Sequence, residues 1–82
     1  MPTAYILVFC EPGSEAAVVD ELRTIPSVVE AATIYGSSYD IIVKVSSDTT
    51  SELNKIISNS IRSVKNVKST QTMTVIEKDK EN

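Results

Sequence analysis

The stretch LRTIPSV at residues 22–28 decides the fold, because IRSVKNV at residues 61–67 repeats its apolar spacing 39 positions later. In both stretches three apolar residues follow at intervals of three, across a point where a helix is expected to end and a strand to begin. They are Leu22, Ile25 and Val28 in the first and Ile61, Val64 and Val67 in the second. The repeat predicts two strand–helix–strand halves.

The first three strands are predicted from short apolar runs. Residues 4–10, AYILVFC, are apolar throughout and too short for a typical helix, which is typical of a strand buried on both faces. Residues 28–35, VVEAATIY, and residues 39–45, YDIIVKV, flank a Gly-Ser-Ser turn at residues 36–38. We expect these two strands to pair as a hairpin.

The last strand is predicted at residues 67–76, VKSTQTMTVI, where polar and apolar residues alternate. The alternation places alternate side chains on opposite faces of the sheet. One face is expected to carry Val67, Ser69, Gln71, Met73 and Val75, and the other Lys68, Thr70, Thr72, Thr74 and Ile76.

Two helices fill the remaining segments. Ser14 is expected to open the first helix, with Glu15 in the first turn, where a negative charge suits the helix dipole. Asp48 or Thr49 is expected to cap the second helix, and Thr49 with Glu52 has capping-box spacing. One apolar stripe follows along this second helix: Leu53, Ile56, Ile57, Ile61 and Val64.

This order predicts a ferredoxin-like α+β fold, βαββαβ, with a four-stranded antiparallel sheet and both helices on one face. Residues 1–77 are expected to form this single ligand-binding and oligomerisation domain, and residues 78–82 a charged, frayed tail. Two helices cover only one face, yet the first strand is apolar on both faces. Soluble monomers rarely expose a large apolar patch, so we expect a second copy to cover the open face in a two-fold dimer.

Charge and composition exclude several classes of function. A formal charge of −3 and a pI of about 4.8 argue against direct nucleic-acid binding, which needs a basic face. No apolar run reaches the ~20 residues of a membrane span. The start of the chain lacks the basic residues of a signal peptide, and a single cysteine cannot form an internal disulfide. We therefore expect a cytoplasmic protein without membrane contacts.

The chain also lacks the residues of an enzyme. Histidine, the commonest general base and metal ligand, is absent, and the two glycines form no phosphate-binding loop. Cys10 ends an apolar run and is expected to be a buried thiol. Small ferredoxin-like enzymes such as monooxygenases typically need a His or Asn-Trp cluster, and Trp is absent as well. We expect no catalytic residues, no metal site and no cofactor.

Two segments are not explained by the fold alone. Asp40 lies just inside an apolar strand, where its carboxylate needs a donor: a ligand ammonium, a backbone N–H or a partner side chain. The threonines of residues 69–74 fit either a solvated strand face or a row of hydroxyls that can both donate and accept.

These residues resemble a known family. AYILVFCEPGSEAAVVDELRTIPSVVEA at residues 4–31, YG followed by YDIIVKV at residues 35–45, the stripe from Leu53 to Val64, and NVKSTQTMTVI at residues 66–76 are similar to the RAM module. This module is the effector-binding domain of the Lrp/AsnC, or feast/famine, regulators. The chain begins at the first strand, so it resembles the stand-alone form that lacks the DNA-binding domain.

The resemblance implies assembly and a ligand. Relatives dimerise through facing sheets, assemble further into rings, and hold free amino acids between dimers. Asp40 would face the ligand ammonium, backbone amides near Gly36 its carboxylate, and threonine hydroxyls would complete the shell. The implied effector-binding residues are Gly36, Ser38, Tyr39, Asp40, Thr70 and Thr72.

The chain departs from the family pattern at one loop, and one alternative function remains open. The family has Gly-x-Tyr-Asp, whereas residues 36–40 read Gly-Ser-Ser-Tyr-Asp, which is one residue longer and alters the pocket. The implied function is amino-acid sensing that modulates transcription through partner proteins, full-length relatives among them. The alternative is an interaction and oligomerisation module with no small-molecule effector.

Overall fold

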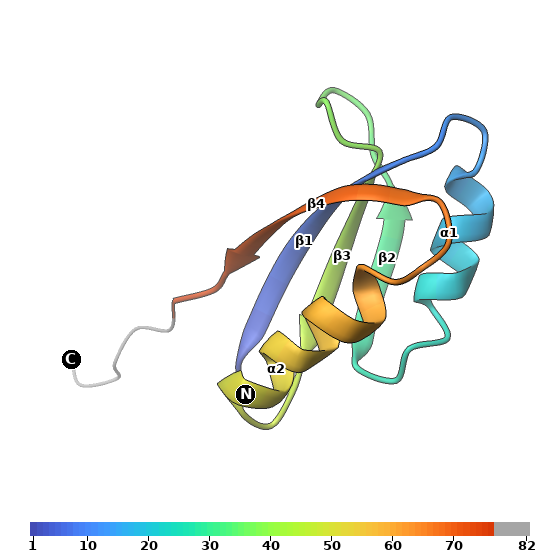
Figure 1. Cartoon of the computed structure of the whole chain (residues 1–82). Helices are drawn as coiled ribbons and strands as arrows, with labels where there is room; N and C mark the ends of the chain where they lie inside the picture. Colours follow the sequence, from blue (N-terminus) through green and yellow to red (C-terminus); the bar gives the residue numbers. More distant parts are fainter. Residues whose placement is uncertain (77–82) are drawn as a thin grey trace.

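The computed structural model describes residues 1–76, in which two helical segments pack on one sheet (Figure 1). The predicted tail at residues 78–82 lies outside the described residues. The elements in chain order are β1 (Thr3–Cys10), α1 (Glu15–Leu22), β2 (Val28–Thr33), β3 (Ile41–Ser46), α2 (Thr50–Ile56), the π-helical turn η1 (Ile57–Ile61) and β4 (Val67–Thr74).

The predicted fold class is confirmed. The sheet has four strands in the order β2-β3-β1-β4, and every neighbouring pair is antiparallel. Together with the element order, this is the ferredoxin-like α+β arrangement. Because β1 and β3 are central, β2 and β4 form the two edges of the sheet.

The internal repeat has a structural counterpart at the exits of the two helical segments. The Ile25 N–H donates to the Leu22 carbonyl at 3.1 Å, and the Val64 N–H donates to the Ile61 carbonyl at 3.3 Å. The next step also matches, because the Val28 N–H donates to Ile25 at 3.0 Å and the Val67 N–H to Val64 at 3.2 Å. The three-residue spacing is therefore accompanied by the same two hydrogen bonds at both exits, although Asn66 in the second turn has φ = +74° and its counterpart Ser27 does not share this conformation.

The core lies between the helices and one face of the sheet. Alternate residues of β1 and β3 are completely or almost completely buried, as the two-residue period of a strand requires. Helix α1 and the α2–η1 segment cover them with three residues each. The core residues are Ala4, Ile6, Val8, Cys10, Ile41, Val43 and Val45 from the central strands, with Val18, Val19, Leu22, Leu53, Ile57 and Ile61 from the helices.

Within residues 1–76, no helix covers the opposite face of the sheet. Tyr5 and Leu7 of β1 are only half-buried, and Phe9 remains 39% exposed. Ile42 of β3 pairs with Leu7, and the Lys44 ammonium lies 5.9 Å from the centre of the Tyr5 ring. Strand β1 would therefore be buried on both faces, as predicted, only if a second molecule covered this surface. We call this surface the open face.

The hairpin strands are shorter than predicted. Strand β2 ends at Thr33 and β3 begins at Ile41, so the connection runs from residue 34 to residue 40. Gly36 has φ = +92°, a conformation that ends the ladder and favours glycine. Asp40 still extends the pairing through its backbone, because its N–H donates to Val8 at 2.8 Å and its carbonyl accepts from Ile34 at 2.9 Å.

The predicted faces of β4 are wrong at Val67. Val67 pairs with the buried Cys10, whereas Ser69 pairs with Phe9 on the open face. A register shift between Phe9 and Cys10 inserts Lys68 as an extra residue. Val67 therefore packs against the core, on the same side as Thr70, Thr72 and Thr74, whose partners are Val8, Ile6 and Ala4.

The two helix starts differ from each other. Ser14 precedes α1 as predicted, but its hydroxyl donates to the Glu11 carbonyl at 2.6 Å instead of capping the helix. Thr49 does cap α2, because its hydroxyl accepts from the Glu52 N–H at 3.1 Å. In a full capping box the Glu52 carboxylate would accept from the Thr49 N–H. Here it accepts from the Ser47 hydroxyl instead, at 3.3 Å.

Replacing Thr49 with alanine should destabilise the fold by about 1 kcal/mol, the usual cost of losing an N-cap. For a domain of this size we expect the melting temperature to fall by roughly 4–8 °C. Thermal unfolding followed by circular dichroism measures the change. Thr50→Ala, one position inside the helix, is the matched control. If the two variants melt together, the Thr49 hydroxyl contributes nothing to the cap.

Within residues 1–76, no helix is both long enough and apolar enough to cross a membrane.

Candidate functional site

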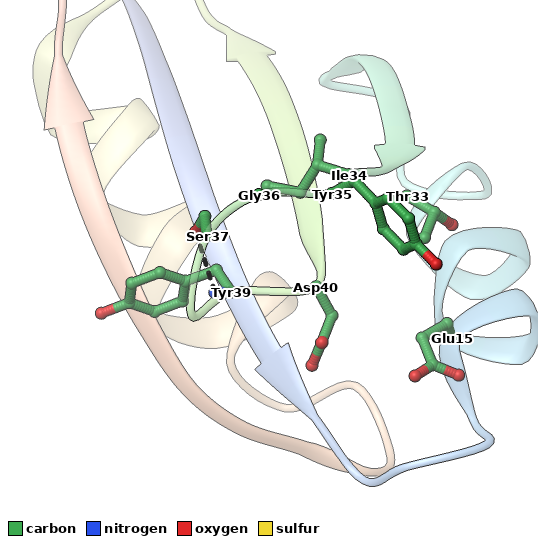
Figure 2. Close-up of a pocket in the computed structure, with 8 residues that line it drawn as sticks. All are labelled: Glu15, Thr33, Ile34, Tyr35, Gly36, Ser37, Tyr39 and Asp40. Atoms are coloured by element: carbon green, nitrogen blue, oxygen red, sulfur yellow. Dashed lines mark hydrogen bonds between the residues drawn. The ribbon is translucent and has the colours of Figure 1, made fainter.

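Three segments converge at one end of the sheet. The carboxyl end of β1, the first turn of α1 and the β2–β3 connection meet there, because the strand–helix–strand topology returns the chain to this edge. Between α1 and the connection lies an open cavity of about 560 Å³ (Figure 2). Its lining residues are Glu15, Thr33, Ile34, Tyr35, Gly36, Ser37, Tyr39 and Asp40.

A backbone hydrogen bond anchors Asp40 in this cavity. One oxygen of its carboxylate accepts from the Cys10 N–H at 3.1 Å. Of the three donors considered for this side chain, the structure therefore supplies the backbone N–H. A carboxylate has about four acceptor positions, so the side chain keeps capacity for another donor. Asp40 is half-buried, which leaves it accessible from the cavity.

The connection is held by its own hydrogen bonds and by one bond to β4. The Tyr39 N–H donates to the Ser37 hydroxyl at 2.9 Å, closing a local turn. The Tyr39 hydroxyl donates to the Gln71 side-chain carbonyl at 3.0 Å. This second bond passes over β1, so it fixes the connection relative to the opposite edge of the sheet. Tyr35, in contrast, is fully exposed at the rim of the cavity.

The predicted site residues are only partly brought together. Gly36, Tyr39 and Asp40 line the cavity, whereas Ser38 lines a separate hollow of about 260 Å³ with Phe9, Tyr39 and Ser69. Thr70 lies on the other side of β1, where its hydroxyl is 3.4 Å from Arg62 Nε. Thr72 is exposed and lines neither hollow. Within one chain, the threonines and the connection therefore do not form a single pocket.

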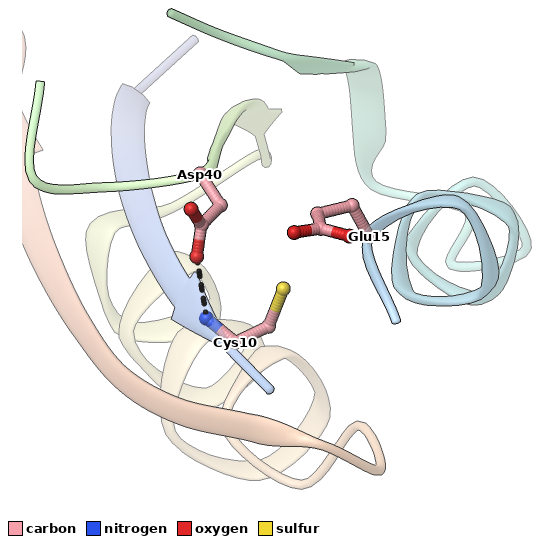
Figure 3. Close-up of side chains that lie close together, drawn as sticks. All are labelled: Cys10, Glu15 and Asp40. Carbon is pink, nitrogen blue, oxygen red and sulfur yellow. Dashed lines mark hydrogen bonds between the residues drawn. The ribbon is translucent and has the colours of Figure 1, made fainter. Parts of the chain in front are cut away.

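The structure adds Glu15 and Cys10, which the sequence reasoning treated as a helix-end charge and a core thiol. The Cys10 sulfur and one carboxylate oxygen each from Glu15 and Asp40 lie within 4.8 Å of one another (Figure 3). The predicted element order already indicated this contact for Glu15, because Glu15 follows β1 after one short turn and must therefore lie near the end of that strand. Among the described residues, these three are the set that could hold a metal ion.

The thiol of this cluster is not prepared to act as a ligand or a nucleophile. Burial raises the pKa of Cys10 above its ordinary value of 9.0, and the charges of Asp40 and Glu15 raise it further. The polar Ser14 side chain acts in the opposite direction and does not offset them. At neutral pH Cys10 therefore carries its proton, and a metal would have to displace it.

The raised pKa of Cys10 gives a prediction for stability at alkaline pH. In the unfolded chain the thiol ionises near pH 9.0, whereas in the folded chain it ionises only at higher pH. Above pH 9 the unfolded state therefore holds fewer protons than the folded state, and stability falls with rising pH. Chemical denaturation between pH 8 and the alkaline limit should show this slope, reduced in Cys10→Ala. Equal slopes in both proteins would contradict the assignment.

Comparison with known families matches almost the whole chain. Residues 3–82 match the family described as the Lrp/AsnC ligand binding domain. Two crystal structures are similar over nearly their full length. FFRP-DM1 is 41% identical with a TM-score of 0.86, and the match covers 93% of this chain and 100% of that chain. Protein PHS023 from Pyrococcus horikoshii is 40% identical with a TM-score of 0.86, covering 95% and 93%.

A curated relative contains a similar sequence within a longer protein. Homocitrate synthase of Sulfurisphaera tokodaii is 47% identical over 76 residues, which is 92% of this chain. The match spans only 16% of that enzyme's length, so it concerns a small part of the longer chain.

Proposed function

Because this chain belongs to the Lrp/AsnC ligand-binding domain family, we propose that it is an amino-acid-sensing module that binds a free amino acid and signals through its assembly. Domains of this family oligomerise and bind amino-acid effectors. The observation that carries the proposal is the cavity at the β2–β3 connection. It combines the half-buried Asp40 carboxylate with the exposed backbone of Gly36, the two features that a zwitterion needs.

Asp40 and the backbone near Gly36 bind the two charged groups of the ligand. Asp40 accepts from the ammonium group, because its carboxylate retains free acceptor positions beside the bond to Cys10. Backbone N–H groups near Gly36 donate to the ligand carboxylate. A Cβ at Gly36 would have space, but φ = +92° would be strained for any other residue.

Assembly completes the pocket. Thr70 and Thr72 lie on the far side of β1 from the cavity, so they reach an effector bound to another copy of the chain. The exposed Tyr35 ring at the cavity rim offers surface for the same contact. The dimer forms through the open face, and the effector occupies the boundary between two dimers. Ser38 and Tyr39 lie on that boundary.

One observation favours the alternative function of an oligomerisation module without an effector. The Cys10 N–H already satisfies one oxygen of Asp40, so the half-buried position of this side chain does not by itself require a ligand. In that case Asp40 stabilises the end of β1 or pairs across a subunit boundary, and amino acids leave the assembly unchanged.

Titration calorimetry with each of the twenty amino acids tests the proposed function. We expect at least one to bind, and sedimentation velocity with that amino acid should show a change in the distribution of oligomers. Binding by none of the twenty would remove the sensing function and leave the oligomerisation module. The same samples, mixed with full-length relatives, show whether the chain co-assembles with regulators and so acts on transcription through them.

A further inference from the structure

The open face carries one acid and one base among its paired residues, Glu30 of β2 and Lys44 of β3. Both alternate along their strands with completely or almost completely buried residues, Ala31 and Val43, so their side chains lie on the open face. The β2–β3 register places Glu30 directly opposite Lys44. In the described sheet, the other paired residues of this face are uncharged. The open face thus contains two opposite charges among neutral side chains.

These two charges do not pair with each other within the chain. The Lys44 ammonium lies 5.9 Å from the centre of the Tyr5 ring, and Tyr5 belongs to β1, on the side of β3 away from Glu30. Within residues 1–76 the ion pair that forms joins Lys68 to Glu11 instead. Lys44 is half-buried and Glu30 is exposed, so water still solvates both charges. Each is therefore available to a partner of opposite charge.

Covering the open face would remove this water. Burial of an ammonium or a carboxylate without a partner of opposite charge is strongly unfavourable. The Tyr5 ring attracts the Lys44 ammonium but does not replace the hydrogen bonds that this group makes with water. The open face therefore disfavours a wholly apolar partner. It favours a partner that supplies an acid to Lys44 and a base to Glu30.

A second copy of the chain meets both requirements at once. In a two-fold interface the same surface is used on both sides, so a contact from Lys44 of one copy to Glu30 of the other occurs twice. Sheets that pack face to face lie about 10 Å apart, a distance that a lysine and a glutamate side chain span together. Tyr5, Glu30, Ile42 and Lys44 line a hollow of about 160 Å³. This volume is below the roughly 300–1,000 Å³ of small-molecule sites and suits a side chain from a facing sheet.

We propose that Lys44 and Glu30 determine which sheet can cover the open face, each by pairing with the opposite charge of a second copy. This inference rests on the open-face dimer of the proposed function. The apolar side chains of the face supply affinity, and the two charges supply selectivity. A relative that lacks either charge leaves one charge of this chain buried without a partner, so it is disfavoured as a partner.

Reversing each charge tests this pairing. Lys44→Glu leaves two acids on the open face and Glu30→Lys leaves two bases, so either variant alone opposes like charges twice in a two-fold dimer. We expect the dissociation constant of each homodimer to rise by about 100-fold or more. A one-to-one mixture of the two variants should form dimers again, because each charge contact then joins an acid to a base. Sedimentation equilibrium at micromolar concentration measures all three samples, and recovery on mixing shows that both variants fold.

Glu21→Lys and Lys55→Glu make the same changes of charge at exposed helix positions and are the matched controls. Each should dimerise like wild type, and mixing them should change nothing. If Lys44→Glu or Glu30→Lys dimerises like wild type, the pairing is overturned. It is also overturned if their mixture stays monomeric, the result expected when the two charges pair only within one chain.

The failure of this inference differs from the failure of the proposed function. Calorimetry measures amino-acid binding independently of the charge reversals. If an amino acid binds and the mixture of reversed variants stays monomeric, sensing stands and the charge pairing is wrong. If the mixture dimerises and none of the twenty amino acids binds, the pairing stands and the sensing function fails.

Discussion

Asp40→Ala should lower the affinity of the chain for its amino-acid effector by about 100-fold, which corresponds to about 2.7 kcal/mol. The substitution removes the carboxylate that accepts from the ligand ammonium, and charge-assisted bonds of this kind are the strong ones. It also leaves the Cys10 N–H without its acceptor at the end of β1. A loss of stability of about 1 kcal/mol should accompany the loss of binding.

Asp40→Asn separates these two effects. Its side-chain carbonyl can still accept from the Cys10 N–H, so the melting temperature should stay close to that of wild type while binding remains weak. Calorimetry and thermal unfolding on the same samples measure both quantities. Asp20→Asn, on the exposed face of α1, is the control for removing one charge. Wild-type affinity in Asp40→Asn would show that its charge does not hold the ligand.

Leu7→Lys should dissociate the proposed open-face dimer, raising its dissociation constant by about 100-fold or more, because a charge would be buried without a partner. Leu7 lies in the middle of β1 on the open face, between Ile42 of β3 and Gln71 of β4. In a two-fold dimer the substitution acts twice. Within one chain Leu7 is only half-buried, so the fold itself should tolerate lysine.

Sedimentation equilibrium at micromolar concentration measures this change. Ala17→Lys adds the same charge on an exposed position of α1 and should leave the dimer intact. A wild-type protein that is monomeric under these conditions would contradict the open-face dimer. So would a Leu7→Lys variant that dimerises like wild type, because the interface would then lie elsewhere.

The element order could be predicted because it depends on local patterns. The repeated spacing from Leu22 to Val28 and from Ile61 to Val67 marks two helix-to-strand turns, and the same two backbone hydrogen bonds occur in both. The boundaries of the hairpin could not be predicted in this way. Tyr35 belongs to an apolar run, yet it is fully exposed because the ladder ends before the left-handed Gly36.

The face assignment of β4 failed for a different reason. Alternation predicts faces only while the register is continuous, and the extra residue Lys68 moves Val67 to the other side of the sheet. No feature of residues 67–76 marks that position, because the shift depends on how β4 pairs with β1.

The sequence by itself determined the fold class and the order of the elements, since these follow from side-chain polarity and short-range periodicity. Only the tertiary structure decided that Glu15 and Cys10 lie beside Asp40, and that Thr70 and Thr72 do not. Contacts between segments far apart in the chain depend on strand pairing and on where each connection ends. A shift of one residue in the strand pairing or in the end of a connection changes which side chains meet. The local amino-acid composition does not indicate such a shift.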